Sequence, residues 1–146
     1  LAMIEIVSSD NLDEILPLIK SYQEFYNAVP TSLAHNKHFF SQFNEESSAG
    51  CQFLYRKEDK VVAFATVYFT FNSNVAAKVA VLNDLYVTPE FRGQQVARQL
   101  IEHCREFARG HGAVRLQWVT APDNLVAQKL YDSLDVKKSE WAFYIY

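Results

Sequence analysis

The stretch from Leu82 to Ile101 places the strongest constraint on how this chain folds. An apolar, strand-like run ends at Val87, a short polar turn follows, and an amphipathic helix is expected from Gln95. The turn holds Gly93, one of only four glycines in the chain. A strand that enters a helix through a tight turn leaves several backbone N–H groups unpaired, and the helix dipole adds partial positive charge there. The segment therefore predicts a site for an anion such as a phosphate.

The length of 146 residues fits one domain with a sizeable core. We take Met3 as the natural first residue and assign a single domain to residues 3–146, leaving Leu1 and Ala2 aside. We find no membrane-spanning run and no signal peptide, so we expect a cytoplasmic protein with no membrane partner. Cys51 and Cys104 lie far apart without histidines at ligand spacing. We therefore expect no metal site and no disulfide.

Charge is unevenly spread along the chain. Residues 1–60 hold nine acidic and five basic side chains, and residues 61–146 hold eight acidic and nine basic ones. This asymmetry fits a cationic substrate beside an anionic cofactor, but random surface variation explains it equally well. No basic stripe is present, so we expect no nucleic-acid partner.

The pattern of apolar residues predicts one α+β domain with a mostly antiparallel sheet. Strands are expected at residues 4–7, 51–56, 61–71, 75–87, 115–119 and, once or twice, 137–146. Helices are expected at residues 12–27, 33–43, 95–110 and 124–134.

The polar turn alone is a weak signal, because glycine often precedes a helix. Neither the dinucleotide fingerprint nor the P-loop spacing is present. The run from Leu85 to Ala97 nevertheless resembles the acetyl-CoA segment of the GNAT superfamily of N-acetyltransferases, whose core pattern is Gln/Arg-x-x-Gly-x-Gly/Ala. Arg92 and Ala97 match its first and last places, whereas Gln95 stands where glycine is usual. We expect Gln95, as a helical residue, to weaken cofactor binding without abolishing it.

A second block extends the resemblance downstream. The family pattern Asn-x-x-Ala-x-x-Leu/Phe-Tyr is matched by Asn124, Ala127, Leu130 and Tyr131, although Asp135 replaces the usual glycine beyond it. With both motifs in order, the chain looks like a GNAT member, most similar to the branch that acetylates histone tails and polyamines. The resemblance implies a GNAT-like mixed sheet of six to seven strands flanked by about four helices.

The resemblance also implies a cofactor site for acetyl-CoA as the co-substrate, without a metal. The end of the strand, at Leu85, Tyr86 and Val87, would hydrogen-bond the pantetheine arm and thioester. Asn124 and Ala127 belong to the second block, where Asn124 would contact the pantetheine side. The pyrophosphate would be held by the backbone amides of Arg92, Gly93, Gln94, Gln95, Val96, Ala97 and Arg98.

Two residues are candidates for catalysis. Tyr131 matches the family tyrosine that protonates the leaving thiolate, although a core aromatic is the plain alternative. Many relatives carry a glutamate base on the strand before the turn, but that place holds Asn83, which cannot take up a proton at neutral pH. Asp84 is the nearest carboxylate and is equally well read as structural. Side chains alternate along a strand, so Asn83 and Asp84 face opposite ways unless a bulge intervenes.

We expect direct attack by a primary amine on acetyl-CoA, with a small cationic amine such as a polyamine favoured by the branch resemblance and the acidic first part. Tyr22, Glu24, Tyr26 and Asn83 are candidates to line the amine site. Amino acids or protein lysines stay open as acceptors, as do a CoA-binding protein without catalysis and a structural module without ligand. The aromatic end, Trp141 to Tyr146, either closes the substrate site, forms a homodimer interface or packs in the core.

Overall fold

The computed structural model describes residues 1–146 and contains one sheet of five strands in the order β1-β2-β3-β4-β5. The first four strands are antiparallel neighbours, and β5 joins β4 in parallel. Glu58 and Asp59 take φ values of 52° and 65° in the turn between β2 and β3, which suits a tight hairpin. The strands are β1 (Ala2–Ile6), β2 (Gly50–Lys57), β3 (Lys60–Asn72), β4 (Ala77–Val87) and β5 (Leu116–Gln117).

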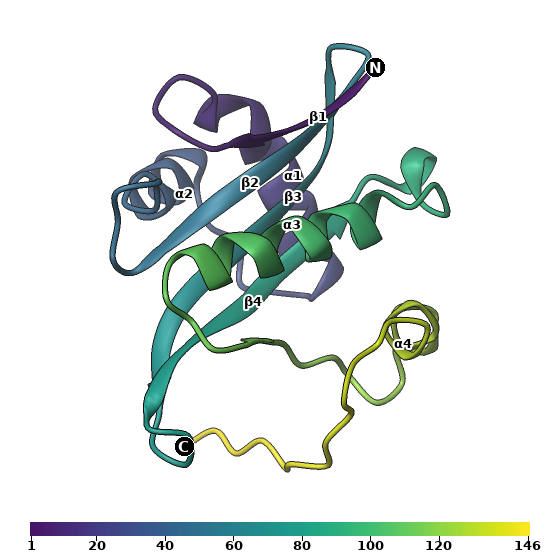
Figure 1. The fold of residues 1–146 in the computed structure, drawn as a ribbon. Coiled ribbons are helices and arrows are strands. Elements are labelled where there is room, and N and C mark those ends of the chain that lie inside the picture. The colour runs from purple at the N-terminus through teal and green to yellow at the C-terminus, as the bar shows by residue number, and fades with distance from the viewer.

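Helices cover both faces of the sheet (Figure 1). On one face lie α1 (Leu12–Phe25) and α2 (Leu33–Phe40), and α3 (Val96–Gly110) crosses the other. The short 3-10 helix η1 (Pro89–Phe91) precedes α3, and α4 (Leu125–Asp132) follows β5. Each long helix buries one apolar stripe against the sheet, for example Ile15 and Ile19 of α1 and Leu100 and Cys104 of α3. None of the helices is long and apolar enough to cross a membrane.

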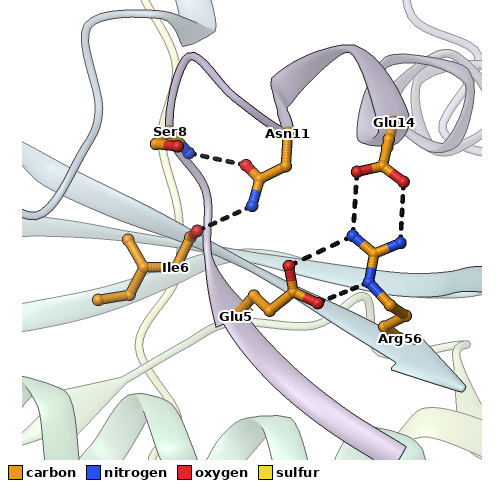
Figure 2. Close-up of polar contacts among 6 residues, drawn as sticks. All are labelled: Glu5, Ile6, Ser8, Asn11, Glu14 and Arg56. Atoms are coloured by element: carbon orange, nitrogen blue, oxygen red, sulfur yellow. Dashed lines mark hydrogen bonds and ion pairs between the residues drawn. The ribbon is translucent and has the colours of Figure 1, made fainter. Parts of the chain in front are cut away.

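Arg56 ties the first helix to the sheet edge (Figure 2). Its guanidinium donates from Nε to Glu5 of β1 at 2.6 Å and from Nη1 to Glu14 of α1 at 2.8 Å. Hydrogen bonds from Arg56 lower the pKa of both carboxyl groups. In the connection before α1, the Asn11 side chain accepts from the Ser8 N–H and donates to the Ile6 carbonyl. These contacts fix where α1 starts and thereby which residues it turns toward the sheet.

A β-bulge in β4 changes which side chains face α1. Thr66 of β3 pairs with Asp84, and the next residue, Val67, pairs with Leu82, so Asn83 has no partner. Leu82 therefore joins the core under α3, whereas Asp84 turns toward α1. The sequence allowed for a bulge between Asn83 and Asp84, and the structure contains one. The bulge brings the Asp84 carboxylate to the α1 side of the sheet.

The ends of β4 and β5 separate soon after they meet. Only Ala80 with Leu116 and Val81 with Gln117 form the parallel ladder, whereas β4 continues to Val87. The edge of β4 beyond residue 81 consequently has no neighbouring strand on that side.

The prediction of six to seven strands is wrong, because residues 137–146 form no strand. Their aromatic pattern suits a strand, but a strand also needs a partner edge, and the β5 ladder is two residues long. Figure 1 shows this segment running as a coil after α4. Trp141 and Phe143 are 87% and 81% exposed, so of the three alternatives for the aromatic end, packing in the core does not hold.

Candidate active site

The turn before α3 presents a row of free backbone donors. The N–H groups of Phe91 and Arg92 close η1 by donating to Thr88 and Pro89. The next six N–H groups, from Gly93 to Arg98, donate to no other group of the protein, and the following one, of Gln99, donates to the Gln95 carbonyl. Gly93 takes φ 75°, a conformation that side chains disfavour. Six free donors at the N-terminus of a 15-residue helix suit the binding of an anion.

Gln95 differs from its sequence-based expectation. It is not part of the helix, which begins at Val96, but precedes it in the left-handed conformation with φ 69°. That conformation costs a non-glycine residue roughly 1–2 kcal/mol, so a glycine would be the natural occupant. The Gln95 side chain accepts a hydrogen bond from Arg98 Nε at 2.9 Å.

Cationic side chains surround the turn. Arg92 donates to the Val87 carbonyl at 2.9 Å, and Arg98 reaches the Ser133 hydroxyl at 2.8 Å just after α4. Lys57, at the end of β2, donates to the Gln94 side chain at 2.9 Å. Lys57 had no local sequence signal, because only the folded hairpin brings it to this turn. The positive charge of these side chains adds to the dipole of α3.

The open edge of β4 continues from the turn. Thr88 N–H donates to the Val62 carbonyl of β3, so alternation along the strand turns the backbone of Tyr86 toward β3 and that of Leu85 and Val87 away from it. With β5 splayed apart, the Leu85 backbone and the Val87 N–H face the gap. The Tyr86 side chain lies on the α1 side, where Arg92 stands 5.6 Å from its ring centroid.

A cleft opens at the splayed end of the strands, which we call the Tyr131 cleft. Tyr131 comes from α4, half-buried, with its ring centroid 5.4 Å from that of Trp118. Burial, and then the nearby Tyr26, raise the pKa of the Tyr131 phenol, so it stays protonated at neutral pH. The lining residues are Tyr22, Tyr26, Leu82, Asn83, Leu85, Trp118, Val119, Thr120 and Tyr131.

On the α1 side lies a larger cavity of about 330 Å³, which we call the Asp84 cavity. Tyr22 and Asn83 line both this cavity and the Tyr131 cleft, so the two spaces adjoin at these residues. The Tyr22 hydroxyl donates to the Asn83 carbonyl at 3.3 Å. The lining residues of the cavity are Ile19, Tyr22, Gln23, Phe39, Phe40, Phe64, Tyr68, Asn83 and Asp84.

Asp84 ends a row of buried polar side chains that crosses three strands. Gln52 of β2 pairs with Thr66 of β3, and Thr66 pairs with Asp84 of β4. The Gln52 amide donates to the Thr66 hydroxyl oxygen at 2.9 Å, which leaves the Thr66 hydroxyl hydrogen for the Asp84 carboxylate. All three residues are buried. The row holds the carboxylate in a fixed position at the cavity wall.

Burial raises the pKa of Asp84 above the ordinary value of an aspartate. Hydrogen bonds from Thr66, Tyr22 and Asn83 lower it in part, and Asn83 Nδ2 lies 2.9 Å from Asp84 Oδ1. No lysine, arginine or histidine lines the cavity to neutralise the carboxylate. A buried, unpaired carboxylate with a raised pKa can take a proton from a cationic ligand at its wall.

The structure brings five of the predicted site residues together in one cleft and leaves others outside it. Tyr22, Tyr26, Asn83, Leu85 and Tyr131 share the Tyr131 cleft, whereas Glu24 lies exposed on α1 and lines neither space.

The second sequence block lies at the start of α4, where Asn124 is the N-cap residue. The Asn124 side-chain oxygen caps this helix by accepting from the Ala127 N–H at 3.2 Å, and its amide nitrogen makes no hydrogen bond within the protein. Both residues are partly buried. The sequence did not mark Gln52 and Thr66, nor any ring of the Asp84 cavity other than Tyr22. A polar residue inside each apolar strand was the available signal for the first two.

Comparison with known proteins agrees with this arrangement. The model of the Acetyltransferase (GNAT) family matches residues 15–135. Thialysine N-epsilon-acetyltransferase of Caenorhabditis elegans is 27% identical over 140 residues, which cover 94% of this chain and 86% of that protein. The N-acetyltransferase YhfO of Bacillus subtilis (strain 168) is also 27% identical, over 118 residues that cover 81% of this chain and 78% of YhfO.

Solved structures give the same result. The crystal structure of a probable acetyltransferase superposes with a TM-score of 0.85 at 30% identity, covering 99% of this chain and 96% of the other. The fold also matches that of the aminoglycoside N-acetyltransferase AAC(6')-Iy in complex with CoA, with a TM-score of 0.84 at 18% identity over 100% of this chain and 94% of the other.

The chain therefore belongs to the GNAT family and is an N-acetyltransferase. Members of this family use acetyl-CoA as the acetyl donor. The six free amides and the open edge of β4 fit a phosphate-bearing, extended cofactor, and the narrow Tyr131 cleft lies at the splayed end of the strands.

Proposed function

We propose that the protein transfers the acetyl group of acetyl-CoA directly to a small cationic primary amine. The observation that carries this proposal is the adjacency of two spaces, one with a protonated phenol and one with a buried carboxylate, which share Tyr22 and Asn83. The acidic first part of the chain alone favours polyamines, with amino acids and protein lysine as alternatives. Its carboxylates line neither space, so this charge does not decide among the acceptors.

The cofactor would lie along the open edge of β4. The amides from Gly93 to Arg98 would hold the pyrophosphate, and Arg92 would contribute its charge nearby. The Leu85 backbone and the Val87 N–H would bond the pantetheine arm. Asn124 has a free side-chain amide that could reach the same arm from α4.

The chemistry then needs one proton acceptor and one proton donor. An amine must lose its proton before it attacks, and Asp84 is placed to accept that proton, directly or through water. The amine nitrogen forms a bond to the acetyl carbon while the bond to sulfur breaks. Tyr131 donates a proton to the departing thiolate. The bulge at Asn83 supports this assignment, because it turns the Asp84 carboxylate toward the α1 side next to Asn83, which itself cannot accept a proton.

Calorimetry with acetyl-CoA followed by a thiol-release assay over a panel of amines tests the proposal. We expect binding at micromolar or lower concentration and release of CoA with at least one amine. Binding without release for any amine would favour a CoA-binding protein that has lost catalysis. Absence of binding would exclude the cofactor site altogether.

A further inference from the structure

The Asp84 cavity contains a single charge. Asp84 is the only ionised side chain in its wall, and six of the nine lining residues are apolar or aromatic. Five of them are rings, contributed by Tyr22, Phe39, Phe40, Phe64 and Tyr68. One carboxylate can pair with one ammonium group, so the cavity offers a paired position for a single positive charge.

Little polar capacity is left over for further groups of a ligand. The Gln23 side-chain oxygen accepts from Asn36, and one of its two amide hydrogens is donated to Asn36, which leaves one N–H free. The single Tyr22 hydroxyl hydrogen is shared between the Asn83 carbonyl and the Asp84 carboxylate. Besides Asp84, the Tyr68 hydroxyl and the Asn83 side-chain oxygen are the polar groups of the wall that make no hydrogen bond within the protein.

Magnitudes disfavour a second charge held against the rings of the cavity, which opens to solvent beyond them. Removing an unpaired ammonium from water costs several kcal/mol, and an aromatic ring returns only about 0.5–2 kcal/mol of that through cation–π attraction. Hydroxyl groups fare no better, because each one buried without a partner costs about 1–3 kcal/mol. The volume of about 330 Å³ also lies near the lower end of small-molecule sites, roughly 300–1,000 Å³.

We propose that the acceptor is a primary amine with one positive charge on an apolar alkyl or aromatic body, and that polyamines, aminoglycosides and zwitterionic amino acids are poor acceptors. This proposal rests on the proposed acetyl transfer and narrows its substrate class. The ammonium sits at Asp84, and the apolar body lies against the rings of α1, α2 and β3. The acidic first part of the chain, which favours a polyamine, contributes no carboxylate to the wall of this cavity.

A matched panel separates the classes. With acetyl-CoA saturating, kcat/KM is measured for hexylamine, 1,6-diaminohexane, 2-phenylethylamine, spermidine, thialysine and kanamycin. We expect hexylamine and 2-phenylethylamine to exceed the other four by about tenfold or more, which corresponds to about 1.4 kcal/mol. Spermidine, thialysine or kanamycin as the best acceptor would overturn the substrate class and leave acetyl transfer intact. No acetylation of any amine would instead defeat the proposed function.

A pair of variants at one residue tests whether this cavity makes the choice. Phe39 lies on α2 in the cavity wall and is 40% exposed, so it tolerates a polar side chain better than the buried rings. Phe39→Glu adds a second carboxylate, and Phe39→Gln removes the same ring without adding charge. We expect the glutamate variant to raise kcat/KM for 1,6-diaminohexane relative to hexylamine by about threefold or more over the glutamine variant. Equal ratios in the two variants would show that the amine binds elsewhere.

Discussion

Asp84 is a residue whose burial opposes stability while serving chemistry. Its pKa is raised in the folded protein, so the folded state binds the proton more tightly than the unfolded chain. The group therefore contributes most to stability below its unfolded pKa of about 4, and this contribution is lost as the pH rises through the higher folded value. At neutral pH the ionised side chain of Asp84 therefore lowers the stability of the folded protein.

Asp84→Asn tests this directly. We expect the variant to be more stable than the natural protein at neutral pH, because the amide has no charge to desolvate. The difference should shrink as the pH is lowered toward the raised pKa of Asp84, since the natural carboxyl then becomes protonated. Urea unfolding at a series of pH values between 5 and 8 measures both. A variant that is less stable at neutral pH, or a difference independent of pH, would contradict a raised pKa at Asp84.

Tyr131→Phe separates catalysis from packing. The phenyl ring keeps the contact with Trp118, and only the hydroxyl that we assign as the proton donor is removed. We expect kcat to fall by more than about tenfold, with a modest change in the affinity for acetyl-CoA. Steady-state kinetics and calorimetry on the same preparation provide the two numbers. Unchanged turnover would leave Tyr131 as a core aromatic.

At the scale of elements, the turn before α3 carries a strained residue. A glycine at this position would relieve the strain at Gln95, roughly 1–2 kcal/mol. It would also make the unfolded chain more flexible, which takes back about 0.5–1 kcal/mol of that gain. Stability alone therefore changes little at this position. The larger effect concerns the anion, because a side chain at residue 95 limits how closely a phosphate approaches the free amides.

Gln95→Gly should consequently tighten acetyl-CoA binding by about threefold or more. Gln95→Ala is the matched control, since it also removes the hydrogen bond from Arg98 but keeps both the Cβ atom and the strained backbone. Calorimetric titration of the three proteins decides the matter. If alanine improves affinity as much as glycine, the side-chain amide and not the backbone is what hinders the cofactor.

The elements show why the sequence predicted some parts and not others. Every strand up to β5 and all four α-helices follow apolar periodicity, so they were predictable within a few residues. The row of buried polar side chains, Gln52, Thr66 and Asp84, was not predictable in this way. Simple counting from the hairpin turn pairs Gln52 with Ala65, but a register shift near Tyr55 pairs it with Thr66 instead. Irregularities of one residue are set by packing across the sheet, which a local pattern does not record.

The candidate site was predictable to the extent that family motifs mark it. Arg92 to Arg98 and Tyr131 lie in local motifs, and the structure puts them at a free helix N-terminus and in a cleft. The walls of the Asp84 cavity come from α1, α2, β3 and β4, and no spacing along the chain joins these elements. Glu24 illustrates the reverse error, since it sits on the expected helix but faces away from the site.

At the scale of the whole molecule, the C-terminal segment is the part that the monomer leaves uncovered. Trp141, Phe143 and Ile145 are each more than 80% exposed, and they alternate as in a strand. Burying a side chain of this size is worth about 1.5–3 kcal/mol, so leaving three in water is costly. The outer edge of β5 also has no strand beside it. Both features favour the homodimer interface, which the sequence left as one alternative for this segment.

We therefore expect the chain to self-associate through this segment. The triple variant Trp141→Ser, Phe143→Ser and Ile145→Ser removes one face of the segment and should be monomeric. Sedimentation velocity at a series of concentrations compares it with the natural chain, and Lys137→Ser serves as a control on the same segment. A natural chain that stays monomeric at high micromolar concentration would contradict this expectation.

The central claim is acetyl transfer from acetyl-CoA to an amine at the junction of the two spaces. Its most direct measurement is the acetylated amine itself, identified by mass spectrometry after incubation with acetyl-CoA and hexylamine and compared with the amount of CoA released. We expect equal amounts of both products from the natural protein, and a rate lower by about 10²–10⁴-fold from Asp84→Asn. No acetylated product from hexylamine or any other amine tested, despite bound acetyl-CoA, would contradict the claim.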